Sequence, residues 1–185
     1  MNAIVRQPVV GGVDGGVGTT TVAAMIDALD AGRIAPDGTE IVDILVARAT
    51  AASVKAAIFT AAAMPVRPVL VVVAHSSDRW SPPVEQRLKM VEPNLPAVVR
   101  MGWISYLAAC DNPWSALVEG IYAQYPSKWA EGARRVREQI VSAVTPLVMR
   151  PPASRAHLGY VEPLTDAATD PSADPDEPVP RARVS

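Results

Sequence analysis

The chain has 185 residues, which is enough for one domain of ordinary size with a short extension but not for two independent cores. A net charge of −2 gives no overall attraction to nucleic acid or an anionic membrane, although a local basic patch would still allow such a partner. The single cysteine excludes an intramolecular disulfide and a cysteine-based metal cluster, and no segment reads as an export signal or a membrane span, so we expect a cytoplasmic protein.

The first predicted element is a short strand over residues 4–10, which ends at a pair of glycines. A glycine-rich loop follows this strand. The apolar residues after the loop recur at three- and four-residue intervals, which predicts a helix over residues 20–29. Glycines and a proline between residues 32 and 38 then predict a turn.

Two more strand–helix pairs and a further strand follow in the sequence. A β-branched run predicts a strand over residues 41–47, and an alanine-rich segment predicts a helix over 51–64. The string VLVVVA at 69–74 is apolar on both faces, which favours a strand in the middle of a parallel sheet. A helix over 81–91 and a strand over 97–104 complete the alternation.

This alternation predicts an α/β fold, namely a three-layer sandwich with a mainly parallel sheet whose ligands bind at the carboxyl ends of the strands. From Trp114 onward the sequence indicates helices, and a stripe of apolar residues between 129 and 144 predicts packing on the sheet. Residues 151–185 are rich in proline, aspartate and alanine without periodicity. They are predicted to be a disordered tail after an α/β domain at 1–150.

The glycine-rich loop is the feature that most strongly suggests a function. Its string GGVDGGVGTTT spans residues 11–21 between a predicted strand and a predicted helix, which is where a phosphate-binding loop lies. Gly15, Gly16 and Gly18 allow backbone angles that turn successive N–H groups toward one anion, and the helix dipole adds attraction. The hydroxyl of Thr20 is the candidate magnesium ligand. A tight turn that needs glycine only for packing is the alternative.

The string DGGVGTTT at residues 14–21 resembles the deviant Walker A loop KGGVGKTT of the MinD/ParA family of P-loop ATPases. The two strings differ where the family has lysines, since this chain has Asp14 and Thr19 there, and Val13 replaces the usual first glycine. A second similarity lies in ILVARATAASVKAA at residues 44–57. The resemblance implies a truncated MinD/ParA-like, P-loop NTPase-like fold that binds ATP or another nucleotide with Mg²⁺.

The departures from the family pattern bear on catalysis. The P-loop lysine places positive charge on the β- and γ-phosphates, whereas an aspartate beside them is repulsive. No aspartate ends a strand as a Walker B residue would, because Arg48 and His75 stand at the ends of the second and third predicted strands. Losing one charge-assisted hydrogen bond costs about 1.5–3 kcal/mol, which weakens binding roughly tenfold to a hundredfold.

We therefore expect a pseudo-ATPase that binds nucleotide or phosphate weakly with little or no hydrolysis. The resemblance implies an accessory factor in partitioning, conjugation or a similar assembly, acting through a protein partner or as a homodimer. One alternative is an active ATPase in which Arg48 or Arg79 of a second subunit supplies the missing cation. Another alternative is a protein-interaction module without a ligand.

The predicted binding residues come from the loop and from two other carboxyl-end segments. Arg48 follows the second predicted strand, and Asp78 lies in the polar segment after the third, where it can equally cap its own loop. No catalytic residue is assigned, and Cys110 is interpreted as a small buried residue. The residues predicted to contact a nucleotide are Asp14, Gly15, Gly16, Val17, Gly18, Thr19, Thr20, Thr21, Arg48 and Asp78.

Overall fold

The computed structural model describes residues 6–149, and the tail predicted to be disordered at 151–185 lies outside the described residues. Five parallel strands of the described part form one sheet in the spatial order β2-β1-β3-β4-β5. The strands are β1 (Val9–Gly12), β2 (Leu29–Arg33), β3 (Ile44–Arg48), β4 (Val69–Val73) and β5 (Val98–Met101). The predicted α/β class with a parallel sheet is therefore confirmed.

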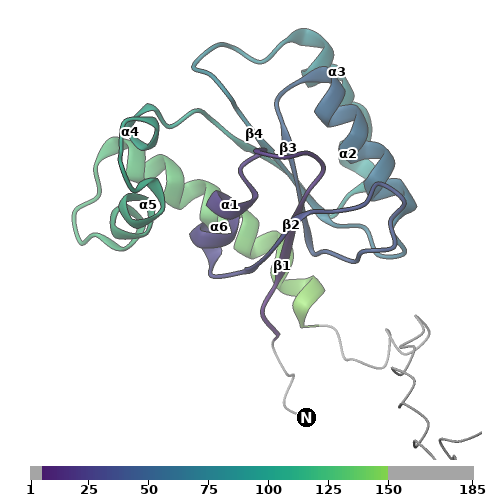
Figure 1. Ribbon diagram of the computed structural model, residues 1–185, viewed down its shortest axis with the longest axis horizontal. Coiled ribbons are helices and arrows are strands. Elements are labelled where there is room, and N and C mark those ends of the chain that lie inside the picture. Colours follow the sequence, from purple (N-terminus) through teal and green to yellow (C-terminus); the bar gives the residue numbers. More distant parts are fainter. Residues whose placement is uncertain (1–5, 150–185) are drawn as a thin grey trace, which may run out of the picture. The chain divides into compact units, whose positions relative to one another are not determined.

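Helices cover both faces of this sheet (Figure 1). Buried residues form two clusters, and successive residues of β3 alternate between them, as the two-residue period of a strand requires. One cluster includes side chains of α2 (Ala51–Ala63) and α3 (Pro82–Val91). The other includes side chains of α1 (Thr19–Ile26), α5 (Pro113–Tyr122) and α6 (Lys128–Val148). This arrangement is compatible with the predicted three-layer sandwich.

The strand β2 is missing from the sequence prediction, which has a helix and a turn in its place. The first helix ends at Ile26 and not near residue 29, because Asp27 adopts a left-handed conformation (φ 55°) that stops it. All five residues of β2 are exposed, so the segment lacks the apolar pattern by which strands are recognised. Backbone pairing with β1, in which Val9 lies opposite Leu29, makes it an edge strand.

The start of the sheet also differs from the prediction. The first strand begins at Val9 and includes Gly11 and Gly12, which the sequence assigned to a loop. A Cβ atom on Gly11 would lie 2.6 Å from the Ile34 side chain. These glycines therefore allow close packing within the strand rather than ending it.

The middle strand is β3, and the prediction that residues 69–74 occupy the middle is wrong. The error follows from missing β2, which adds a strand on the far side of β1. The short helix α4 (Ser105–Ala108) was also missed, whereas the helices predicted over 51–64 and 81–91 are confirmed as α2 and α3. Among the helices of the described residues, none combines the length and apolar composition needed to cross a bilayer.

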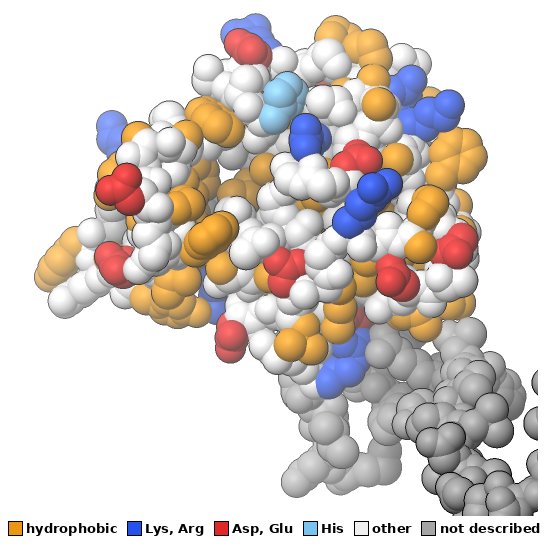
Figure 2. Space-filling view, viewed as in Figure 1, with side chains coloured by type: hydrophobic (Ala, Val, Ile, Leu, Met, Phe, Trp, Pro, Cys, Tyr) orange, Lys and Arg blue, Asp and Glu red, His pale blue; other side chains and the backbone are white. Residues whose placement is uncertain are grey.

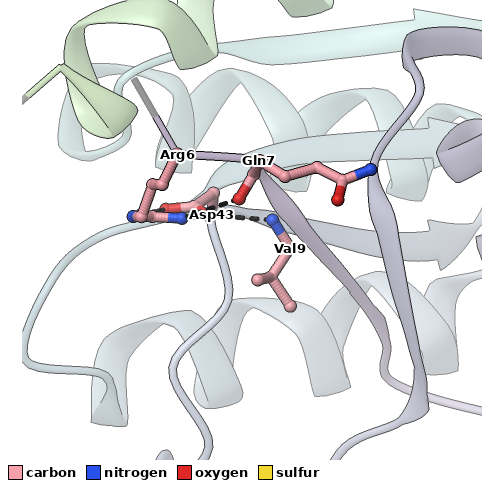
Figure 3. A network of polar contacts seen from close by, with 4 residues as sticks. All are labelled: Arg6, Gln7, Val9 and Asp43. Atoms are coloured by element: carbon pink, nitrogen blue, oxygen red, sulfur yellow. Dashed lines mark hydrogen bonds and ion pairs between the residues drawn. The ribbon is translucent and has the colours of Figure 1, made fainter. Parts of the chain in front are cut away.

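A partly buried ion pair joins the amino-terminal ends of β1 and β3 (Figure 3). The guanidinium of Arg6 donates to both carboxylate oxygens of Asp43, at 2.5 and 2.6 Å, and the N–H of Val9 donates to the same carboxylate at 2.9 Å. The Asp43 side chain is only 3% exposed. Because Asp43 precedes β3, it lies at the opposite edge of the sheet from the glycine loop and acts as a structural residue.

Candidate functional site

The glycine loop connects the carboxyl end of β1 to the first turn of α1. Gly16 and Gly18 have φ angles of 69° and 95°, a region that side chains disfavour, and Gly18 is the N-cap of α1. No side chain caps this helix start. The loop therefore folds in a way that leaves the first N–H groups of the helix available to a ligand.

Most backbone N–H groups of this loop have no hydrogen-bond partner among the described residues. Val13 donates its N–H to Val46 O at 3.1 Å, and Val22 donates to Gly18 O at 3.0 Å. Between them, Gly15 and Gly16 form a turn in which the Val17 N–H faces the Asp14 carbonyl, and no other N–H group from Asp14 through Thr21 donates a hydrogen bond within the part of the chain described. Unpaired N–H groups at a helix start attract anions, because their partial charges and the helix dipole add together.

These donors border a hollow of about 320 Å³. Its walls include most of the loop, three residues of β2 and one side chain at the start of α5. The residues that the sequence prediction missed are Asp30, Gly32, Arg33 and Trp114. Nothing in the sequence placed the β2 residues here, because β2 itself was not predicted, and Trp114 was noted only as the start of a helical region.

Thr19 stands where P-loop ATPases have a lysine. Its side chain is 9% exposed, lines the hollow and lies against Gly12, and its hydroxyl has no hydrogen-bond partner among the described residues. Because no buried side-chain oxygen or nitrogen of the described residues lacks a hydrogen-bond partner, this hydroxyl is accessible and can bond with a ligand in the hollow.

Thr20, the predicted magnesium ligand, donates its hydroxyl to the carboxylate of Asp30 at 2.7 Å. The N–H of Gly32 donates to the other oxygen of that carboxylate at 2.8 Å. Within the described residues, no group of three or more histidine, cysteine, aspartate or glutamate side chains is placed to hold a metal ion. A magnesium ion at Thr20 and Asp30 would therefore need further ligands from phosphate oxygens or water.

Two arginines bring positive charge to the loop. Arg48, at the end of β3, donates a hydrogen bond to the carbonyl of Gly15 within the same chain, and a Cβ on Gly16 would lie 3.2 Å from its Nη2. Arg33 lines the hollow and has no hydrogen bond or ion pair among the described residues. Two carboxylates, Asp14 and Asp30, lie at the same hollow, and Figure 2 shows basic and acidic side chains interspersed on this face.

The remaining predicted residues have other surroundings. Asp78 lines a second hollow of about 360 Å³, and its carboxylate accepts a hydrogen bond from the Ser76 hydroxyl at 2.9 Å, so it orders its own loop. The side chain of Val17 is buried in the core, so Val17 can contact a ligand only through its backbone. Thr50, two residues beyond Arg48, caps α2 by accepting a hydrogen bond from the Ser53 N–H.

No protein-family model matches the chain, and neither a curated protein nor a solved structure matches it significantly. The arguments about function therefore depend on the geometry of the loop and the hollow.

Proposed function

We propose that the protein binds the phosphate groups of a nucleotide, or of another phosphorylated ligand, on the loop from Asp14 to Thr21. The observation that carries this proposal is the run of successive N–H groups without partners at the start of α1. Thr19 lines the same hollow, so its hydroxyl can add a hydrogen bond to a phosphate oxygen. The position of the loop supports the proposal, because parallel sheets bind ligands at the carboxyl ends of their strands.

The binding is weak and hydrolysis is slight or absent, as in a divergent MinD/ParA-like P-loop protein. Thr19 cannot supply the charge that a lysine places on the phosphates, and Asp14 adds repulsion. Arg33 and Arg48 compensate in part, although the guanidinium of Arg48 already bonds the Gly15 carbonyl. Mg²⁺ strengthens binding, since it neutralises phosphate charge next to the Asp30 carboxylate.

A role through protein contacts is supported by exposed apolar side chains in and around α4 and α5. Figure 2 shows hydrophobic side chains on the surface of the α4–α5 side of the molecule. Such exposure favours a protein partner or a second copy of the chain, consistent with an accessory factor in partitioning, conjugation or a similar assembly. The exposed side chains are Trp103, Tyr106, Val118, Tyr122 and Tyr125.

The proposal is tested by titrating the protein with ADP, ATP, GTP and pyrophosphate, with and without Mg²⁺, in a calorimeter. We expect dissociation constants in the high micromolar to millimolar range, tighter with Mg²⁺, and no phosphate release from ATP. Turnover of ATP would instead favour an active ATPase. Absence of binding at millimolar concentrations of every ligand would leave the interaction module as the better account.

A lysine restored at the loop provides the sharper comparison. We expect Thr19→Lys to tighten pyrophosphate and ADP binding roughly tenfold, because it adds a charge-assisted hydrogen bond to phosphate. Thr39→Lys is the matched control, since it adds the same charge at an exposed threonine that does not line the hollow. Equal affinities in wild type and Thr19→Lys would show that the loop does not face phosphate.

A further inference from the structure

Trp114 lines the glycine-loop hollow from a second helix. It lies in the first turn of α5, where the Asn112 side chain accepts a hydrogen bond from the Ser115 N–H at 3.1 Å and fixes the start of the helix. Buried Leu117 and Ile121 join α5 to the core cluster that includes α1. Trp114 therefore lines the hollow from a helix that packs on the same core as α1.

The Trp114 side chain is 49% exposed although it lines the hollow. Among the described residues, the stacked aromatic pair is Tyr106 with Trp129, so the Trp114 ring has no aromatic partner. A large apolar ring left half exposed beside unpaired N–H donors suits a ligand that has both a flat apolar part and an anionic part. Inorganic phosphate alone would leave the indole uncovered.

We propose that the ligand of this hollow is a nucleotide whose base stacks on Trp114 while its phosphates lie on the loop. Arg33 also lines the hollow, and its side chain has no partner among the described residues, so it is available to the phosphates or the sugar. This inference rests on the proposed function, because the loop must first bind phosphate. It makes Trp114 the residue that distinguishes nucleotides from other phosphorylated compounds.

The test compares ADP with pyrophosphate, which shares its diphosphate but lacks a base, by calorimetry on the full chain with Mg²⁺. We expect wild type to bind ADP about tenfold tighter than pyrophosphate, as stacking of one base on an aromatic ring provides. Trp114→Leu should remove the preference for ADP and leave pyrophosphate affinity unchanged. Trp114→Phe keeps an aromatic ring and should keep most of the preference for ADP. Trp103→Leu is the control, since Trp103 is 42% exposed but lines another hollow.

Equal affinities of wild type for ADP and pyrophosphate would overturn this inference and leave the phosphate loop standing. Unchanged ADP affinity in Trp114→Leu would do the same and would assign Trp114 to a protein-contact surface. If wild type binds neither compound, the proposed function fails, and the inference fails with it.

Fluorescence gives a second measurement that does not need the leucine variant to fold. ADP should quench part of the tryptophan emission of wild type, and this quenching should disappear in Trp114→Phe even though that variant still binds ADP. Quenching that persists in Trp114→Phe would overturn the stacking role.

Discussion

Gly16 and Gly18 hold backbone angles that set the direction of the loop N–H groups, and Gly18 is the more constrained of the two. Its φ of 95° is strained for any side chain, although an added Cβ would meet Val73 only at an ordinary contact distance of 3.5 Å. We expect Gly18→Ala to lower the free energy of unfolding by about 1 kcal/mol or more and to weaken pyrophosphate binding. Urea denaturation and calorimetry measure the two effects.

Gly15→Ala is the matched control for this substitution. Gly15 has no positive φ, and a Cβ there would meet no atom within 4 Å. The stability of the Gly15→Ala variant should therefore be close to that of wild type. If Gly15→Ala and Gly18→Ala were equally stable and bound pyrophosphate equally well, the left-handed conformation of Gly18 would not matter for the site.

The Arg6–Asp43 pair is the second residue-scale feature with a measurable consequence. The hydrogen bond to Asp43 raises the pKa of Arg6 above the ordinary arginine pKa. The stabilisation from this pair is therefore fully present below the ordinary pKa and is lost as the pH rises through the raised pKa. We expect no pH dependence from Arg6 near neutrality. Arg6→Ala should lower the free energy of unfolding by about 3 kcal/mol, because it leaves the buried Asp43 carboxylate without its cation.

Urea denaturation at pH 7 checks this expectation. Arg33→Ala, which removes an exposed arginine without a partner among the described residues, should change stability by no more than about 0.5 kcal/mol. Equal stabilities of Arg6→Ala and Arg33→Ala would mean that the Arg6–Asp43 ion pair does not stabilise the fold.

At the scale of elements, the sequence predicted best those segments whose burial is periodic or complete. The run at β4 is apolar on both faces, and Ala51–Ala63 has high helix propensity between a threonine cap and a following proline, so both were predicted closely. β2 could not be predicted in the same way, since its exposed residues LDAGR pair only through the backbone. Its existence depends on β1, which lies elsewhere in the sequence.

The contact between α5 and α6 depends on a small residue. An added Cβ on Gly120 would collide with the ring of Trp129, whose Cζ2 would lie 2.8 Å away. We expect Gly120→Ala to lower the free energy of unfolding by about 1–3 kcal/mol, because either the ring or the helix must shift. Thermal or urea denaturation measures the change.

Gly132 of α6 offers the matched control, because a Cβ there would meet nothing within 4 Å. Gly132→Ala should raise stability by roughly 0.5–1 kcal/mol, as alanine favours helix over glycine. A stabilising Gly120→Ala would contradict the close packing of the two helices.

At the scale of the whole molecule, the sequence predicted one wall of the site and missed the other. The loop from Asp14 to Thr21 follows from local glycine spacing, and Arg48 follows from its place at the end of a strand. Arg33 and Trp114 reach the hollow only because β2 pairs with β1 and α5 packs near α1, which are tertiary facts without a local pattern. Asp78 was predicted to belong to the site because it follows a neighbouring strand, but it lines a different hollow.

The central claim is that the unpaired N–H groups of the loop bind phosphate. It is tested most directly by recording backbone amide resonances of the ¹⁵N-labelled protein during titration with pyrophosphate and Mg²⁺. The account predicts large, saturable shifts confined mainly to the amides from Asp14 through Thr21. Loop resonances that stay unchanged at millimolar pyrophosphate, or saturable shifts that occur only elsewhere in the chain, would contradict it.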